Sequence, residues 1–310
     1  MLKRIDRQQL RVGMFIEAFE GAAVDARFAD RRFLLDKPAD LKNLKTTTSG
    51  TVIINTARGS DVPGGDGVVL ATEGSHAKTK RDVAILTKTL TKAGGLVRDV
   101  FETLRNGGAI SVETVAPIVN QITEAMEHNP VIVINLTRLK TKDEATFIHS
   151  LAVCALMIRF ARYMNFNAEM IRVLGMGGLL HDVGKTGIPA DILMKPDALA
   201  GEEMTLMKSH PAIGYDILSR QDGIPAIVLD ICLNHHERPN GSGYPAGLSG
   251  DQISVYTRMC SICDVYDALT SARPYKKPWT AMQAAAWMLE KQGFFDRDLL
   301  NQFLKGVMKL

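Results

Sequence analysis

Hydrophobic residues follow two different patterns along the chain. Near the N-terminus, short runs rich in β-branched residues, Val12-Gly-Met-Phe-Ile-Glu and Thr51-Val-Ile-Ile-Asn, predict strands. Turn-forming sequence such as Gly64-Gly-Asp-Gly follows them. From about residue 80 onward, apolar residues recur at helical spacing. The patterns therefore predict a mainly α protein, in which a small β-rich or α+β domain precedes a helical domain.

Two helices are expected between residues 80 and 130. The first has one apolar face, made of Val97, Val100, Phe101 and Leu104. Gly107-Gly108 ends this helix, Ser111 caps the next one, and Asn129-Pro130 ends that in turn. The apolar side of the second helix consists of Val112, Val115, Ile118, Val119, Ile122 and Met126. Such faces are typical of core packing or a connecting helix pair, and a dimer contact is the alternative.

We assign residues 1–75 to the small domain, 76–130 to a helical connector and 131–310 to the main helical domain. The run from Val131 to Leu136 has the β-propensity of a strand, but its helical surroundings favour a helix. Asp143 can cap a following helix, and nearly every segment beyond it has helical spacing.

Composition narrows the class of protein. With 310 residues, 46% apolar and 23% charged, the chain resembles a soluble globular protein. A net charge of +3, spread along the sequence, argues against a long nucleic acid as partner. No apolar run reaches the roughly 20 residues of a membrane span, and the N-terminus lacks the apolar core of a secretory signal. We therefore expect a cytoplasmic protein.

The four cysteines suit a reducing compartment. Cys260 and Cys263 form a single CxxC, and no second pair completes a zinc site. We interpret them as small side chains on one turn of a helix next to Asp264, in preference to a redox or zinc pair.

Histidines and acids form an ordered series in the second half of the chain. Five of the seven histidines belong to this series of His149, His181-Asp182, His210, His235-His236 and Asp264. Imidazole and carboxylate groups ligate Fe, Mn or Zn. The series holds more such groups than one metal can use, so it predicts a cluster of at least two metals that activates water.

Local sequence adds detail to this cluster. His181-Asp182 follows an apolar segment with small residues, and a buried Asp is costly unless it is paired or bound to metal. Its two oxygens can bridge two metals. Lys185, four residues beyond His181, is expected on the same helix face and indicates a phosphate between lysine and metals.

Neighbouring His235 and His236 can reach one metal only where their helix distorts. Glu237 and Asp267 are candidates for supporting the ligands.

Three motifs together resemble one family. His181-Asp182-Val-Gly-Lys185, His235-His236-Glu237 and Gly243-Tyr244-Pro245 are similar to the HD-GYP domain, a branch of the HD phosphohydrolases. The run from Asp264 to Lys276 matches the later signature of that domain, and the similarity covers about residues 130–310. The N-terminal part resembles the DUF3391 domain.

The N-terminal resemblance rests on Leu10-Arg-Val-Gly-Met-Phe-Ile and on the run from Val52 to Asp61, although a tryptophan common in that domain is missing. The HD-GYP resemblance implies an all-helical catalytic domain that hydrolyses cyclic di-GMP to pGpG and/or GMP. It implies iron or manganese as the metals. A hydroxide bridging two metals would attack phosphorus, while Lys185 offsets the developing charge.

The resemblance also implies a role for each site residue. One metal would take His149, His181, Asp182 and Asp264. The other would take Asp182, His210, His235 and His236. Lys185, Arg273 and Lys276 would contact phosphate or guanine, and Tyr244 would contact the substrate or hold its loop. Asp182 and Lys185 would thus carry the catalytic roles.

The chain departs from the family pattern at Ala145 and Asn240. Members with three metals carry Glu at the first position, so two metals are expected here. The second position usually holds Asp, and its loss could alter loop packing or substrate fit. Two other functions stay open, namely a receptor that binds cyclic di-GMP without cleaving it and an enzyme for another cyclic dinucleotide such as 3',3'-cyclic GMP-AMP. A homodimer or signalling partner proteins would fit either.

Overall fold

The structure is a computed structural model. It describes residues 2–20, 28, 32–47, 51–56, 58–62, 68–70, 72–138, 145–193, 195, 197–271 and 278–308. The chain forms two compact units, Met1–Asp82 and Val83–Leu310. Each unit has its own hydrophobic core. The expected turn at Gly64, the cap at Asp143, and the substrate contacts of Arg273 and Lys276 lie outside the described residues.

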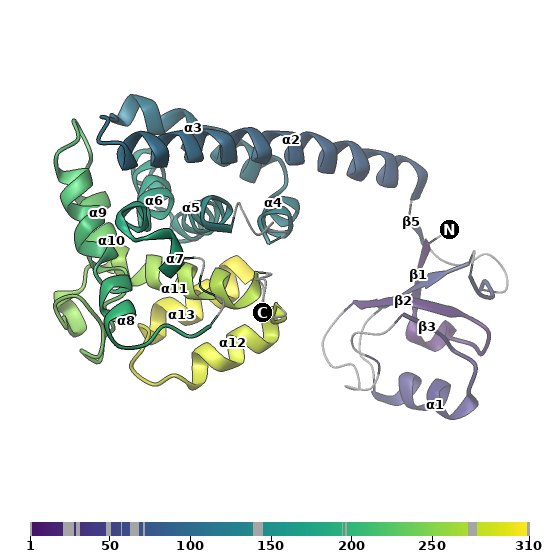
Figure 1. The fold of residues 1–310 in the computed structure, drawn as a ribbon. Coiled ribbons are helices and arrows are strands. Elements are labelled where there is room, and N and C mark those ends of the chain that lie inside the picture. Colours follow the sequence, from purple (N-terminus) through teal and green to yellow (C-terminus); the bar gives the residue numbers. More distant parts are fainter. Residues whose placement is uncertain are drawn as a thin grey trace. The chain divides into compact units, whose positions relative to one another are not determined.

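The N-terminal unit contains an antiparallel sheet, several strands of which are labelled in Figure 1. It has five strands in the order β3-β2-β4-β1-β5. Its elements are β1 (Leu2–Asp6), the 3₁₀ helix η1 (Arg7–Gln9), β2 (Phe15–Glu20), β3 (Phe33–Leu34), α1 (Pro38–Thr47), β4 (Thr51–Asn55) and β5 (Val68–Leu70). In β4, Val52 and Ile54 are buried while their neighbours are half-buried, which is the alternation of a strand with one face on the core. The strand expected from Val12 begins at Phe15, because Val12 and Gly13 lie in a turn.

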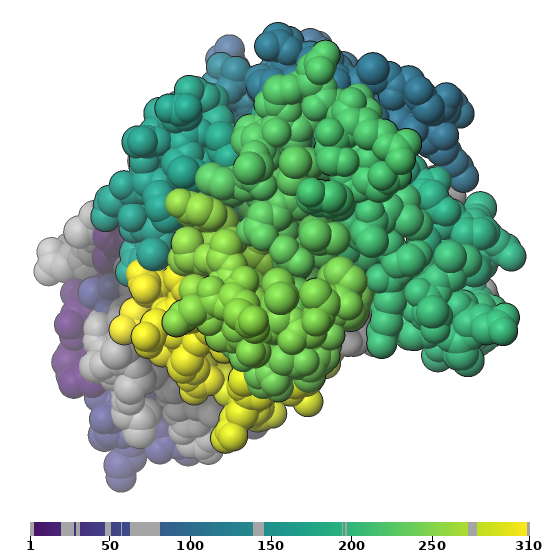
Figure 2. Space-filling view, turned by 90° about the vertical axis from the view of Figure 1, so that its left-hand side faces the viewer, coloured from purple at the N-terminus to yellow at the C-terminus, as the bar shows by residue number. Residues whose placement is uncertain are grey.

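The second unit is helical, so the predicted mainly α fold with a small α+β domain is confirmed. Its α-helices are α2 (Thr72–Arg105, which begins in the first unit), α3 (Val112–His128), α4 (Pro130–Thr137), α5 (Ala145–Tyr163), α6 (Ala168–Leu180), α7 (Ala190–Leu193), α8 (Gly201–Met207), α9 (His210–Ser219), α10 (Ala226–Asn234), α11 (Val255–Thr270), α12 (Ala281–Glu290) and α13 (Arg297–Phe303). Shorter elements are the 3₁₀ helices η2 (Val183–Gly187) and η3 (Gly250–Gln252), and a π-helical turn η4 (Leu304–Met308). The segment from α8 to η3 forms much of the face seen in Figure 2.

The predicted helix boundaries agree with the structure. Helix α2 ends at Arg105, just before the glycine pair, and Ser111 is the N-cap of α3. The run from Val131 to Leu136 is helical, with the Asn129 side chain capping α4. The apolar faces of α2 and α3 are mostly buried in the main core, which confirms the core-packing interpretation of these positions. A separate role for residues 76–130 as a connector stays a prediction.

Close packing of α5 against α6 sets the base of the candidate site. A Cβ atom on Gly178 of α6 would lie 3.0 Å from the backbone of Val153 and Cys154 in α5, so a larger residue would force the helices apart. The close approach brings the rings of His149 and His181 to a centroid distance of 5.2 Å. The expectation that small residues before His181 allow close packing is therefore confirmed.

Candidate metal centre

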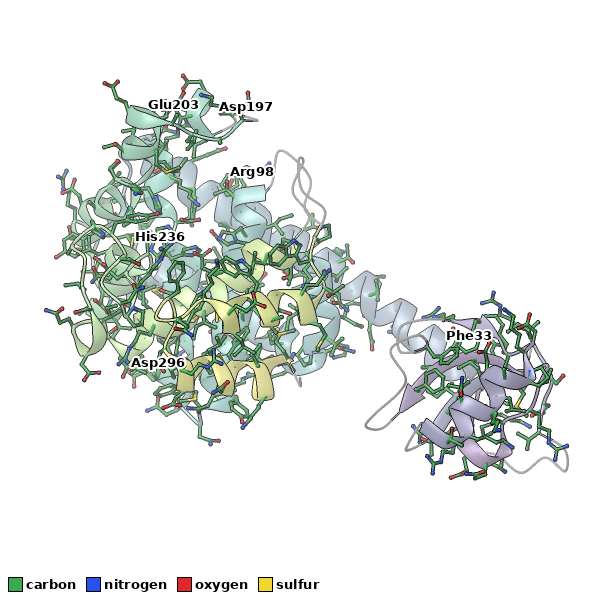
Figure 3. The ribbon with its side chains drawn as sticks, turned by 90° about the horizontal axis from the view of Figure 1, so that it is seen from below. Phe33, Arg98, Asp197, Glu203, His236 and Asp296 are labelled. Carbon is green, nitrogen blue, oxygen red and sulfur yellow. The ribbon has the colours of Figure 1, made fainter. Side chains whose placement is uncertain are left out.

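The histidine and aspartate series converges on one place in the helical unit. Two adjacent groups form there, each with ligand atoms within 4.8 Å of one another. The first group is His149, His181 and Asp264, and the second is Asp182, His210, His235 and His236. Figure 3 shows His236 within the bundle of helices, whereas Glu203 and Asp197 lie at its edge. All seven ligand candidates from the sequence are thus brought together.

The ends of helices position five of these side chains. His181 is the C-cap of α6, and Asp182 follows it directly. His210 is the first residue of α9. His235 is the C-cap of α10, so His235 and His236 both lie beyond its last helical residue, with ring centroids 4.1 Å apart. The helix thus ends at this histidine pair and does not continue through it in distorted form, and this end lets both rings face the same group.

Asp182 lies between the two groups and presents one carboxylate oxygen to each. Its Oδ2 is 3.4 Å from His181 Nε2 and 3.6 Å from His149 Nε2. Its Oδ1 is 3.3 Å from His210 Nε2 and 3.7 Å from His235 Nε2. Asp264 completes the first group, with Oδ1 at 3.0 Å from His149 Nε2. This arrangement is what a carboxylate that bridges two cations requires.

Hydrogen bonds at Nδ1 orient the histidine rings. Nδ1 of His181 donates to the carbonyl of Gly178 at 2.8 Å, and Nδ1 of His210 donates to that of Met207 at 2.7 Å. Nδ1 of His235 donates to the carbonyl of Cys232 at 2.9 Å. A carbonyl oxygen only accepts, so each neutral ring keeps its proton on Nδ1 and turns the lone pair of Nε2 inward. Metal-binding histidines use this pattern.

Polar atoms in the centre lack partners of the right kind. Among the described residues, His181 Nε2 and Asp182 Oδ1 are buried without a hydrogen bond. His210 Nε2 and His235 Nε2 lie only 3.2 Å apart. In their Nδ1-protonated neutral forms, both atoms carry lone pairs, so they cannot bond to each other. A cation at each group would satisfy these atoms, and the donor set of imidazoles and carboxylates fits divalent transition metals.

The protonation states also suit metal binding. Burial lowers the pKa of His181 and His235, and lowers that of His236 to about 3, so these rings are neutral ligands. Burial by itself would raise the pKa of Asp182, but the positive charge of Lys185 lowers it well below its ordinary value. Burial would also raise the pKa of Asp264, but the contact of its carboxylate with the His149 ring lowers that pKa instead. The site therefore combines neutral imidazoles with ionised carboxylates.

Lys185 lies in η2 and not on the helix of His181, so the expected shared helix face is wrong. Helix α6 ends at Leu180, and the chain turns into η2. Gly184 allows this turn to pack on α9, because a Cβ atom there would lie 1.9 Å from the carbonyl oxygen of His210. The path nevertheless brings the Lys185 ammonium into contact with the carboxylate of Asp182. The lysine side chain is 26% exposed, so it also faces the outside of the centre.

Asp267 supports His149 from the next turn of α11. Its Oδ2 accepts from His149 Nδ1 at 2.6 Å, and its Oδ1 accepts from the Ser271 hydroxyl at 2.7 Å. Asp267 and Asp264 therefore contact opposite nitrogens of one ring. Ser271 was not expected from the sequence, because a hydroxyl that orients a carboxylate has no motif of its own.

Replacing Asp267 with Asn is expected to weaken metal binding by roughly 10- to 100-fold, since removal of such a supporting carboxylate has effects of that size. Titration of the metal-free protein with Mn²⁺ measures the affinity. At saturating metal the variant should recover most of its activity. An unchanged metal affinity would show that the carboxylate has no influence on the centre.

Glu237 holds a loop and does not orient a metal ligand, which corrects the expectation from the sequence. Its carboxylate accepts backbone N–H groups of Ala246, Gly247 and Leu248 at 2.6, 3.0 and 3.0 Å. The reason is that the chain folds back after Tyr244, so these amides meet the buried carboxylate. The adjoining Asn240 accepts from the amide and hydroxyl of Ser242, which forms a compact turn in place of the usual Asp.

Replacing Glu237 with Gln should reduce stability by about 1–3 kcal/mol, because the amide group offers one accepting oxygen to three buried donors. Chemical unfolding of the variant measures this change. Glu124→Gln is a suitable comparison, since Glu124 is exposed on α3. Equal stability of the Glu237 variant and the wild type would contradict the assigned role.

Tyr244 joins the same loop to the centre. Its ring stacks on His236, with centroids 4.7 Å apart and an angle of 27° between planes. The ammonium of Lys208 lies 5.4 Å from the Tyr244 ring centroid. Burial raises the pKa of the phenol, so the hydroxyl stays protonated and available as a donor. Tyr244 thus packs against a ligand candidate of the second group.

The cysteines take the structural role expected for them. Cys260 and Cys263 lie on α11, are buried, and form no disulfide. Burial raises the pKa of both thiols well above the ordinary value, which keeps them protonated.

Two further polar contacts near the cysteines had no signal in the sequence. The Ser261 hydroxyl donates to the His235 carbonyl at 2.5 Å. The Asp230 carboxylate accepts from the Thr257 hydroxyl at 2.9 Å.

The helical fold and the two neighbouring histidine–aspartate groups are typical of proteins that bind two metal ions at one centre. Residues 121–299 match the family described as HD domain, and residues 2–115 match a domain of unknown function, DUF3391. The chain belongs to the HD domain family. The predicted resemblances to HD phosphohydrolases and to DUF3391 are thereby confirmed.

The chain is 39% identical to "Cyclic di-GMP phosphodiesterase PA4108" of Pseudomonas aeruginosa, over 99% of this chain and 77% of that protein. It is 33% identical to "3'3'-cGAMP-specific phosphodiesterase 2" of Vibrio cholerae, over 60% of this chain and 36% of that protein. Among solved structures, "Bd1817, a HDG"Y"P protein from Bdellovibrio bacteriovorus" matches both chains over 100% of their length, with 17% identity and a TM-score of 0.58. That structural likeness concerns the fold.

Among the described residues, no helix has the length and apolar character needed to traverse a lipid bilayer.

Proposed function

We propose that this chain is a metal-dependent phosphodiesterase that hydrolyses cyclic di-GMP to pGpG and/or GMP in the cytoplasm. The observation that carries the proposal is the position of Asp182, with one buried oxygen toward each histidine group. The similarity to PA4108 over nearly the whole chain supports the substrate. The HD domain match over residues 121–299 supports the class of reaction.

The centre would hold two divalent ions, and its histidine and carboxylate donors favour Fe or Mn. One ion would take His149, His181, Asp182 and Asp264. The other would take Asp182, His210, His235 and His236. Bound ions would supply a water-derived nucleophile and positive charge for the phosphoryl group. The buried imidazoles and their Nδ1 partners hold this ligand geometry before the substrate arrives.

Lys185 and Tyr244 would act on the substrate directly. The ammonium of Lys185 contacts Asp182 and is partly exposed, so it can also donate to a phosphate oxygen at the centre and offset its charge. Tyr244 presents a protonated hydroxyl beside His236 and can donate to the substrate while its ring holds the loop. Arg273 and Lys276, outside the described residues, remain predicted contacts to phosphate or guanine.

Single-turnover hydrolysis tests the proposal. Metal-loaded protein in excess over cyclic di-GMP, with Mn²⁺ or Fe²⁺ in the absence of oxygen, is expected to yield pGpG or GMP. Binding of cyclic di-GMP without any product would leave the receptor function instead.

A second substrate has a specific observation in its favour. The chain is also similar to 3'3'-cGAMP-specific phosphodiesterase 2, although over a shorter stretch. The longer match to PA4108 favours cyclic di-GMP. Comparing kcat/KM for the two cyclic dinucleotides decides between them, and cyclic di-GMP is expected to have the higher value.

A further inference from the structure

A pocket lies beside the metal centre, between α2 and the segment that carries Lys185. It has a volume of about 130 Å³ and is lined by Phe101, Glu102, Arg105, Thr146, Phe147, Lys185, Thr186 and Leu193. All of these residues belong to the helical unit. Lys185 is common to pocket and centre, because its ammonium also contacts the Asp182 carboxylate. A ligand with a phosphate at the centre can therefore extend a neighbouring group into this pocket.

The pocket combines aromatic walls with two opposite charges. The rings of Phe101 and Phe147 meet edge to face, with centroids 5.7 Å apart. Glu102 and Arg105 are exposed and lie three residues apart on α2. Within the part of the chain that the structure describes, neither charged side chain forms an ion pair or hydrogen bond with another residue. An acceptor and a donor group are thus available beside the apolar side chains of Phe101 and Phe147.

We propose that this pocket binds a guanine base of the substrate, with Arg105 and Glu102 as the residues that recognise it. The inference rests on the proposed function, since it places one base of the dinucleotide whose phosphate lies at the metal centre. A planar guanidinium donates two hydrogen bonds to O6 and N7 of guanine. A carboxylate accepts from N1–H and the amino group at position 2 of the same base. Phe101 and Phe147 provide apolar contact with the base at the pocket wall.

The same two residues disfavour adenine. Adenine presents an amino donor at position 6, where the Arg105 guanidinium also donates, and an unprotonated N1, where the Glu102 carboxylate also accepts. Each mismatch leaves a polar group without its partner. Helix α2 would therefore contribute base specificity to a site whose metal ligands come from other elements. A cyclic dinucleotide with two adenines should be the poorest substrate.

Arg105→Ala tests this proposal in the metal-loaded full chain. The KM for cyclic di-GMP should rise roughly 5- to 100-fold, which corresponds to the loss of one bidentate base contact, while kcat changes less. The preference for cyclic di-GMP over cyclic di-AMP should fall with it. Arg105→Lys, which keeps the charge but loses the fork, should give an intermediate KM. Lys92→Ala is the matched control, because Lys92 is exposed on the same helix and lies outside this pocket.

Bis(p-nitrophenyl) phosphate, a diester without a base, separates the pocket from the centre. In Arg105→Ala, the ratio of kcat/KM for cyclic di-GMP to that for this diester should fall. Equal losses for all three substrates, or an unchanged KM for cyclic di-GMP, would overturn the proposal. If wild-type protein cleaves the small diester but not cyclic di-GMP, the proposed function fails. In that case, equilibrium binding of cyclic di-GMP to the wild type and to Arg105→Ala tests the pocket. Equal affinities of the two proteins, or no binding by the wild type, would overturn the proposed guanine site.

Discussion

Asp182→Ala is expected to abolish both metal occupancy and turnover. The carboxylate of Asp182 faces His181 and His149 with one oxygen and His210 and His235 with the other, so its loss removes a ligand from both groups. Metal ions supply several kcal/mol of transition-state stabilisation, so kcat/KM should fall by at least roughly 10³-fold. Elemental analysis and hydrolysis of cyclic di-GMP measure the two effects.

The fold should survive this substitution. Asp182 Oδ1 is a buried atom without a hydrogen bond in the described part of the chain, so alanine relieves an unsatisfied group in the metal-free protein. Circular dichroism of both metal-free proteins checks this point. Asp216→Ala is the matched control, because Asp216 lies on α9 but is exposed and paired with Arg220. Full activity and full metal content in Asp182→Ala would refute its bridging position.

Removal of metal is expected to lower the thermal stability substantially. The centre buries the facing Nε2 atoms of His210 and His235 and the unpaired Nε2 of His181, and bound cations would satisfy them. Ions at about 1,000 times their Kd contribute roughly 4 kcal/mol to the free energy of unfolding. For a domain of this size, that corresponds to a fall in Tm of roughly 8–16 °C on chelation.

Differential scanning calorimetry before and after dialysis against a chelator measures this difference. Returning Mn²⁺ should restore both Tm and hydrolysis. The Asp182→Ala protein serves as the control, because its Tm should respond little to chelator or Mn²⁺. A wild-type Tm that does not change on chelation, in protein shown to contain metal beforehand, would contradict the assignment of these side chains as ligands.

Local features of the fold were predictable because they depend on neighbouring residues. The spacing of Val97 and Phe101 identified a buried helix face, and Ser111 identified the start of α3. The helix at Val131–Leu136 required its surroundings as well, since its own residues favour a strand. Propensity and spacing fix such elements before any long-range contact is known.

The members of the candidate site were also predictable, because histidines beside buried acids are rare without a role. Their division into two groups was implied by the family resemblance, and the two groups of ligand candidates are visible in the structure. The path of the backbone between them was not predictable in the same way. Lys185 lies in η2 because Gly184 packs on α9, and Glu237 meets the amides of a loop that folds back. Such contacts depend on tertiary packing that no local pattern records.

The pocket at Glu102 and Arg105 illustrates the same limit. Both residues look like ordinary solvated charges of an amphipathic helix when only α2 is considered. Their relation to Lys185 arises because α2 packs against the helices of the centre, which places residues about 80 positions apart around one cavity. Sequence spacing could assign the buried face of α2, but it could not show which exposed residues border the site.

Elemental analysis of protein purified without oxygen is the sharpest test of a dinuclear centre, because it counts and identifies the metals in one measurement. We expect close to two equivalents of Fe or Mn per chain. One equivalent or less in protein that hydrolyses cyclic di-GMP would contradict a dinuclear centre built on Asp182.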